Sequence, residues 1–169
     1  MKRYIKLYDL IGFKICWILC AFCSVWEKPY LGPLAALIFI IGHLSIVKFN
    51  FRDIKIIFIA ILLGFILDTL FLSFGFVGYK GSVSYAPLWI IAMWAGFSIT
   101  LIYTLDKLQN KYFLASLLGL VGGPLSYQAG VGIGSITITN NTSYIILAIA
   151  WAFSVPLLLS LIKYFSNNQ

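Results

Sequence analysis

Three ionisable side chains lie inside long apolar runs of this sequence, where a proton or a charged ligand would find its partner. They are Asp68, Lys14 and His43, the one histidine of the chain. A carboxyl group can serve as a general base, an imidazole can relay a proton and an ammonium group can hold an anion. At membrane depth each costs about 2.5–3.5 kcal/mol unless it finds a partner or water. Asp68 is therefore the leading candidate site residue.

Each of these groups also has a structural interpretation, which the sequence leaves open. Asp68 would then cap a broken helix, or accept hydrogen bonds from tyrosines of a neighbouring helix. His43 would be a packing residue with a satisfied ring. Lys14 would extend its long side chain to the nearby membrane interface.

A segment rich in glycine, residues 115–134, is the next unusual feature. Ala115, Gly119 and Gly123 are four residues apart, a spacing that lets two helices approach closely. Pro124 follows Gly122 and Gly123, and because proline removes a backbone donor we expect the helix to kink or break there. The alternative is a kinked packing helix without a ligand.

Polar and aromatic side chains around this expected break predict a polar pocket that opens outward among the third to sixth apolar runs. Backbone exposed at such a break must be buried in protein or face a watery cavity. Trp94 and Trp151 lie deep inside their runs, and we interpret them as packing residues in preference to residues that line a ligand cavity. The candidate ligand-binding residues are Asp68, Trp89, Trp94, Tyr127, Gln128 and His43. The candidate break and packing residues are Gly119, Gly122, Gly123, Pro124 and Pro156.

Several kinds of chemistry are missing from the sequence. A single histidine cannot build a histidine-rich metal centre, and no phosphate-binding loop pattern is present. We therefore expect no metal, no cofactor and no catalytic residue that can be named. The net charge of +7 fits anionic lipid headgroups better than nucleic acid.

Composition places these residues in a membrane protein. The 169 residues are 62% hydrophobic and 10% charged, whereas a soluble domain carries about 25% charged residues. A helix needs roughly 20 apolar residues to cross a bilayer. We predict a single all-α domain, a polytopic helix bundle with six transmembrane spans near residues 10–26, 30–47, 54–76, 85–105, 112–132 and 143–164.

The distribution of lysine and arginine predicts the orientation of these spans. Basic loops resist translocation, so the side that collects them is cytoplasmic. The opposite side receives only Lys28 and Lys80. We therefore predict that both ends of the chain lie in the cytoplasm, on the side that holds Lys2, Arg3, Lys6, Lys48, Arg52, Lys55, Lys107, Lys111 and Lys163.

Several motifs together resemble an uncharacterised family of small bacterial inner-membrane proteins, catalogued as domain of unknown function twenty-eight seventy-eight. The resemblance covers most of the chain, and it implies an inner-membrane location but no activity. Lys14 departs from the family's pattern. The motifs are Tyr30-Leu-Gly-Pro-Leu34, Leu67-Asp68, Pro87-Leu-Trp89 and Gly122-Gly-Pro-Leu-Ser-Tyr-Gln-Ala-Gly130. The residues that match motif positions are His43, Asp68, Trp89, Trp94, Gly123, Pro124 and Tyr127.

Three hypotheses for function follow, in descending order. The first is a transport component that binds a small molecule or lipid in the outward pocket. The second is a structural or accessory subunit that docks a partner helix, or a second copy of the chain, on the glycine-rich segment. The third is a lipid-modifying enzyme with Asp68 as general base.

Overall fold

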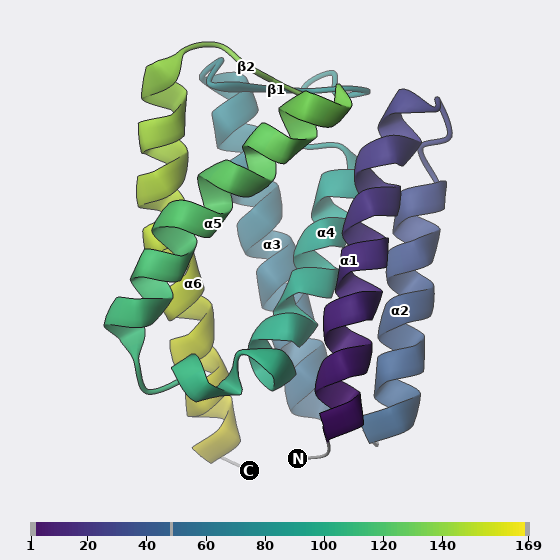
Figure 1. Cartoon of the computed structure of the whole chain (residues 1–169), viewed down its shortest axis with the longest axis vertical. Helices are drawn as coiled ribbons and strands as arrows, with labels where there is room; N and C mark the ends of the chain where they lie inside the picture. The colour runs from purple at the N-terminus through teal and green to yellow at the C-terminus, as the bar shows by residue number, and fades with distance from the viewer. Residues whose placement is uncertain (1–2, 48, 168–169) are drawn as a thin grey trace.

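The computed structural model describes residues 3–47 and 49–167, so Lys2 and Lys48 of the charge pattern lie outside it. Over the described residues the chain forms six α-helices and one small two-stranded sheet (Figure 1). The helices are α1 (Arg3–Val25), α2 (Leu31–Val47), α3 (Phe51–Ser73), α4 (Leu88–Ile99), α5 (Tyr112–Ile133) and α6 (Asn141–Asn167). The predicted all-α class and the number of helices are confirmed. The sheet was not predicted.

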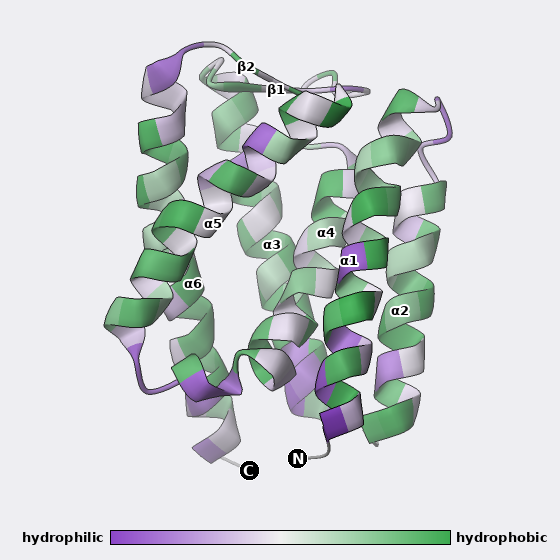
Figure 2. Cartoon of the chain, viewed as in Figure 1, coloured by the Kyte–Doolittle hydropathy of each residue, from purple (hydrophilic) through white to green (hydrophobic). Residues whose placement is uncertain are grey.

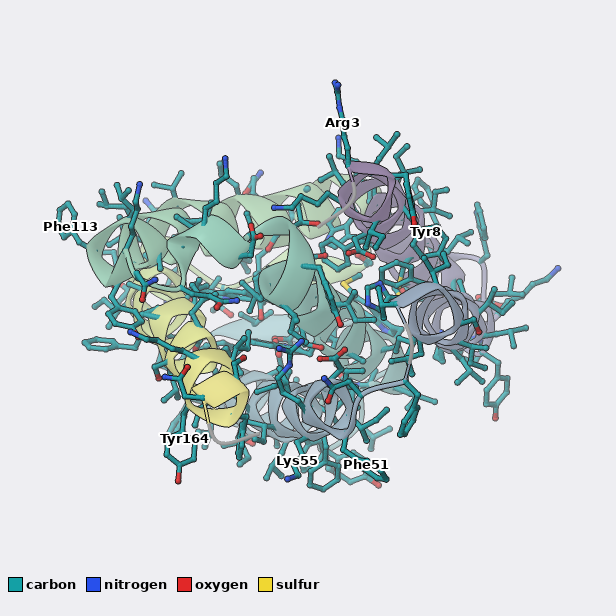
Figure 3. The ribbon with its side chains drawn as sticks, turned by 90° about the horizontal axis from the view of Figure 1, so that it is seen from below. Arg3, Tyr8, Phe51, Lys55, Phe113 and Tyr164 are labelled. Atoms are coloured by element: carbon teal, nitrogen blue, oxygen red, sulfur yellow. The ribbon has the colours of Figure 1, made fainter. Side chains whose placement is uncertain are left out.

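The length and hydropathy of the helices identify this chain as a multi-pass membrane protein. Helices α1, α3 and α6 are each long and apolar enough to cross a bilayer, and two shorter apolar helical stretches span Leu31–Val47 and Leu88–Thr104. Figure 2 shows hydrophobic residues along the length of the helices and hydrophilic residues at both ends, more densely at the end where both termini lie. Large apolar side chains point outward in a way that water would not favour. Phe51, Phe113 and Tyr164, for example, extend away from the bundle (Figure 3).

The helices pack mainly as neighbours in sequence: α1 with α2, α3 with α4, and α5 with α6. The strands β1 (Val77–Tyr79) and β2 (Ile136–Ile138) pair antiparallel across the end opposite the termini, with Tyr79 beside Ile136. Because β1 follows α3 and β2 follows α5, this pairing ties two helices that are distant in sequence. After α4 the chain continues through a π-helical turn, η1 (Thr100–Thr104), and a short 3-10 turn, η2 (Asp106–Leu108).

Helix α5 is continuous through Pro124, so the break expected at Gly122-Gly123-Pro124 does not form. A proline inside a helix costs one backbone hydrogen bond, and packing against a neighbour can hold the helix together. Here α6 supplies that packing. A Cβ atom on Gly119 would lie 2.1 Å from the carbonyl oxygen of Trp151, and one on Gly123 would meet the Trp151 side chain at 2.3 Å. Only glycine allows this approach.

Candidate functional site

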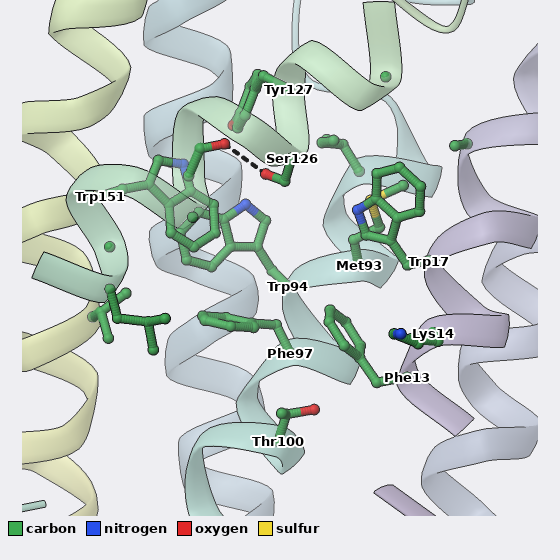
Figure 4. Close-up of a pocket in the computed structure, with 18 of the residues that line it drawn as sticks. Phe13, Lys14, Trp17, Met93, Trp94, Phe97, Thr100, Ser126, Tyr127 and Trp151 are labelled. Atoms are coloured by element: carbon green, nitrogen blue, oxygen red, sulfur yellow. Dashed lines mark hydrogen bonds between the residues drawn. The ribbon is translucent and has the colours of Figure 1, made fainter. Parts of the chain in front are cut away.

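A groove of about 370 Å³ lies between α1 on one side and α5 and α6 on the other, with α4 and η1 as its floor (Figure 4). Its rim is formed by residues that are themselves exposed, among them Leu10 and Lys14 of α1 and Leu118 and Gly122 of α5. Since these residues lie on the outer faces of membrane helices, the groove opens laterally, toward the lipid that surrounds such helices.

The groove exists because α5 presents glycine rather than bulky side chains toward it. Gly119 and Gly123 seat Trp151 of α6, whereas Gly122 faces the groove with no atom within 4 Å of the position its Cβ would take. In Figure 1, α5 crosses the bundle obliquely in front of α3 and α4. A side chain at Gly122 would therefore occupy space that the fold leaves empty.

Aromatic rings line the groove from both sides. Trp94 of α4 stacks on Trp151 of α6, with ring centroids 4.5 Å apart and planes 14° from parallel. Phe97 meets Trp151 edge-on at 5.4 Å, and Phe13 of α1 lies 5.9 Å from Phe97. Such pairs form a rigid apolar surface at low cost in side-chain entropy. The lining favours a ligand that is itself apolar over most of its length.

Asp68 lies behind this aromatic wall and does not line the groove. It is fully buried and accepts three hydrogen bonds: from the Tyr79 hydroxyl at 2.5 Å, from the Trp94 indole N–H at 2.6 Å and from the Tyr127 hydroxyl. We call these four residues the Asp68 cluster. Burial raises the pKa of the Tyr79 hydroxyl, in β1, well above its usual value, and the neighbouring Tyr127 and Asp68 raise it further. The hydroxyl therefore stays a hydrogen-bond donor.

The Asp68 cluster fixes two residues that do line the groove, Trp94 and Tyr127. Trp94 can lie against α3 only because residue 64 is glycine, where a Cβ atom would meet the indole ring at 2.2 Å. The cluster thus joins α3, β1, α4 and α5 through one carboxyl group. The hydrogen bonds of the Asp68 cluster therefore hold Trp94 and Tyr127 in place in the wall of the groove.

One end of the groove, nearer the chain termini, carries polar groups. Lys14 of α1 and the hydroxyl-bearing Thr100 and Thr104 of η1 all line it. The hydroxyl oxygens of both threonines are buried and have no hydrogen-bond partner among the residues that the structure describes. A π-helical turn is a local departure from α-helix that is frequently found at functional sites.

Two carboxyl groups that the sequence analysis left out, those of Asp9 and Asp53, are also buried. Asp9, predicted to precede the first span, lies inside α1, and its Oδ1 is 2.5 Å from Nδ1 of His43. Asp53, predicted to lie in a loop, is inside α3, where it pairs with Arg52 and accepts from the Tyr103 hydroxyl. Both helices begin earlier than their most apolar segments.

The structure brings together some of the predicted site residues and separates others. Asp68 is behind the wall, His43 is paired with Asp9 away from the groove, and the exposed Gln128 accepts from the Tyr144 hydroxyl. Pro124 and Pro156 are not part of the lining. The lining does contain Trp89, Trp94, Tyr127, Gly119, Gly122 and Gly123.

The expected pocket differs from the groove in two respects. It was predicted to be polar, whereas most of the lining is apolar, and it was predicted among spans three to six, whereas α1 takes the place of α3. Sequence reasoning therefore missed the α1 side. A signal was present, because Leu10, Lys14, Trp17 and Ala21 follow one another at helical spacing on one face.

A second cavity, of about 560 Å³, lies among the loops at the end opposite the termini. Glu27, which has a positive φ of 57°, and Lys80 both line it. Trp89 borders both cavities and donates its indole N–H to the Lys80 carbonyl at 3.1 Å. It separates the loop cavity from the groove.

Comparison with known proteins relates this chain to a protein family. A family model described as "Protein of unknown function (DUF2878)" matches residues 6–157, which is most of the chain and includes every residue of the groove. No curated protein and no solved structure matches.

Proposed function

We propose, from the premise that this chain belongs to the DUF2878 family of proteins of unknown function, that it binds an acyl-chain lipid or a similarly apolar small molecule from the membrane. The site is the groove between α1 and α5. In this proposal the protein serves as a binding component of a transport system in the bacterial inner membrane.

The proposal includes six crossings of that membrane with both chain ends in the cytoplasm. Two observations support it. Both termini lie at the same end of the bundle, as an even number of crossings requires (Figure 1). The hydrophilic residues are denser at that end as well, which agrees with the excess of lysine and arginine expected on the cytoplasmic side.

Thiol labelling tests this topology. Asn110→Cys and Thr142→Cys place a cysteine at exposed positions of opposite ends, and the native Cys16, Cys20 and Cys23 are buried. We expect a membrane-impermeant maleimide to label Thr142→Cys in spheroplasts and to label Asn110→Cys only after the membrane is permeabilised. The wild-type protein is the control for background. Labelling in the reverse order would refute the orientation.

The observation that carries the proposed function is the shape and lining of the groove. Its volume of about 370 Å³ falls within the range of small-molecule sites, roughly 300–1,000 Å³. Its walls are stacked aromatic rings and its rim is exposed on spanning helices. A ligand that enters from the bilayer would leave one apolar environment for another, so close packing and a few polar contacts must supply its affinity.

Filling the groove is the direct test. Gly122→Leu places a side chain in the open space, and we expect ligand occupancy after purification to fall by roughly tenfold or more, because ligand and leucine compete for the same volume. Gly132→Leu is the matched control: it is on the same helix, equally free of neighbours, and outside the groove. The measurement is native mass spectrometry with extraction of bound lipids.

Equal ligand occupancy in the two variants would contradict the proposal. A wild-type protein that carries no ligand from the membrane and binds none of a panel of added lipids would contradict it as well. In either event an accessory role becomes the better hypothesis. We rank an enzyme last, because Asp68, its one candidate general base, is fully buried and already accepts three hydrogen bonds.

A further inference from the structure

Three polar side chains without a partner among the described residues line the end of the largely apolar groove that lies nearer the chain termini. Lys14 is exposed on α1, and Thr100 and Thr104 face the same space from η1. In Figure 4 the hydroxyl of Thr100 points toward the side of the groove that holds Phe13 and Lys14. Thr100 is 6% exposed, so its free hydroxyl is a buried polar group directed into the groove.

The two threonines are unusual among the hydroxyl residues of these helices. Ser45, Ser154 and Ser166 each donate to the carbonyl oxygen four residues earlier, which is the ordinary way to satisfy a hydroxyl group inside an apolar helix. Thr100 and Thr104 make no such bond. A hydroxyl group left without a partner in an apolar environment is destabilising, and an acceptor on a ligand would remove that cost.

Lys14 is likewise without a counter-charge in the part of the chain that the structure describes. The chain has five acidic residues. The three at the same end of the bundle are engaged elsewhere: Asp106 pairs with Lys6 at 2.6 Å, Asp9 with His43 at 2.5 Å and Asp53 with Arg52 at 2.8 Å. The others are Asp68, in its cluster, and Glu27, at the loop cavity.

Depth makes this isolation costly. Lys14 is two helical turns beyond Lys6, about 12 Å along α1 at 1.5 Å per residue. A lysine that only anchored the helix at the interface would not account for two unpartnered hydroxyl groups in the lining of the same groove. An ammonium group with two hydroxyl donors provides the hydrogen bonds that an anion accepts.

We propose that this end of the groove binds the anionic head group of a single-chain acyl lipid from the leaflet that faces the chain termini. The phosphate or carboxylate contacts Lys14, Thr100 and Thr104, and the chain runs along Phe13 and Trp94. The inference rests on the proposed function and specifies its ligand class. Lys14 then selects among the lipids that the groove accepts.

The test compares two lipids with the same brominated acyl chain, a lysophosphatidic acid and a monoacylglycerol, which differ only in the phosphate. Bromine quenches tryptophan fluorescence on contact, and Trp17, Trp94 and Trp151 line the groove. Titrations are made in neutral detergent. We expect the wild type to bind the lysophosphatidic acid roughly tenfold or more tightly than the monoacylglycerol, the effect of a charge-assisted hydrogen bond.

Lys14→Gln is expected to abolish that preference and to leave the affinity for the monoacylglycerol unchanged. Lys163→Gln, which removes a charge from an exposed lysine of α6 away from the groove, should retain it. A Thr100→Val, Thr104→Val double variant should weaken the preference in part. If Lys14→Gln folds poorly, Lys14→Arg, which keeps the charge, should retain it.

Three results would overturn the inference. They are a wild type without preference, a preference that survives Lys14→Gln, and displacement of the lysophosphatidic acid by inorganic phosphate at equal concentration, which would assign the site to a free anion. In all three the proposed function stands if monoacylglycerol binding is lost in Gly122→Leu. If neither lipid binds, the proposed function fails and this inference with it.

Discussion

Replacing Asp68 by alanine is expected to lower the free energy of unfolding by about 3–5 kcal/mol, a large effect for one residue. The carboxyl group satisfies three buried donors, on Tyr79, Trp94 and Tyr127. Its removal orphans all three, at about 1–3 kcal/mol each, although the costs are not strictly additive. It also releases the contact that ties β1, α4 and α5 to α3.

The native cysteines provide the measurement. Cys16, Cys20 and Cys23 are free and at most 1% exposed, so a thiol-reactive dye reports unfolding without any added label. Asp106→Ala is the matched control, because Asp106 is a partly exposed residue whose pair with Lys6 should contribute about 0–1 kcal/mol. If Asp68→Ala melts at the same temperature as Asp106→Ala, the Asp68 cluster is not a structural tie.

Asp68→Asn separates the structural role from a ligand-binding role. The amide oxygen still accepts one or two of the hydrogen bonds, while the amide N–H₂ group opposes a donor on the other side. We expect partial destabilisation with the groove retained. Loss of ligand at full stability would instead return Asp68 to the ligand contacts predicted from the sequence.

The second large effect is expected at the Asp9–His43 pair. Both side chains are fully buried, with Oδ1 of Asp9 and Nδ1 of His43 2.5 Å apart. Within residues 3–47 and 49–167, the other oxygen of Asp9 and the other ring nitrogen of His43 have no partner. His43→Leu leaves the carboxyl group buried and alone, which typically costs about 3–5 kcal/mol. The same dye-based melting curve measures it.

The double variant Asp9→Leu, His43→Leu is the control that identifies the cause. A buried pair replaced by apolar residues of similar volume is often neutral or stabilising, so we expect the double variant to recover most of the stability lost in His43→Leu. A double variant as unstable as the sum of the single variants would mean that the two residues act independently. The loss would then come from packing around the ring.

The sequence predicted part of the candidate site because some of its signals are local. The spacing of Ala115, Gly119 and Gly123 describes a face of α5 without reference to the rest of the chain, and these three residues do lie on its one buried face. Proline at 124 predicted a kink or a break, since the lost hydrogen bond is also local. The break does not form, because Trp151 and the α6 backbone pack against α5 from outside, and the kink stays a prediction.

Partners across helices could not be predicted in this way. Asp68 and Tyr127 are 59 residues apart, and Asp9 and His43 are 34 apart. Their contacts depend on the rotation of each helix about its axis. In apolar surroundings many rotations bury a similar area, so small differences in packing choose among them. The helical spacing of Leu10, Lys14, Trp17 and Ala21 could be recognised in the sequence, but the sequence of α1 did not indicate which helices this face would meet.

Hydropathy alone established the membrane character and the six helices, because a bilayer imposes on each segment separately the length and apolarity that it needs. It also identified Asp68 and His43 as buried polar residues that require a partner. The identity of the partners, the burial of Asp9 and Asp53, and the position of the groove between α1 and α5 came from the fold. Polar groups buried among apolar helices are satisfied pairwise, and a pair exists only once two helices have been placed side by side.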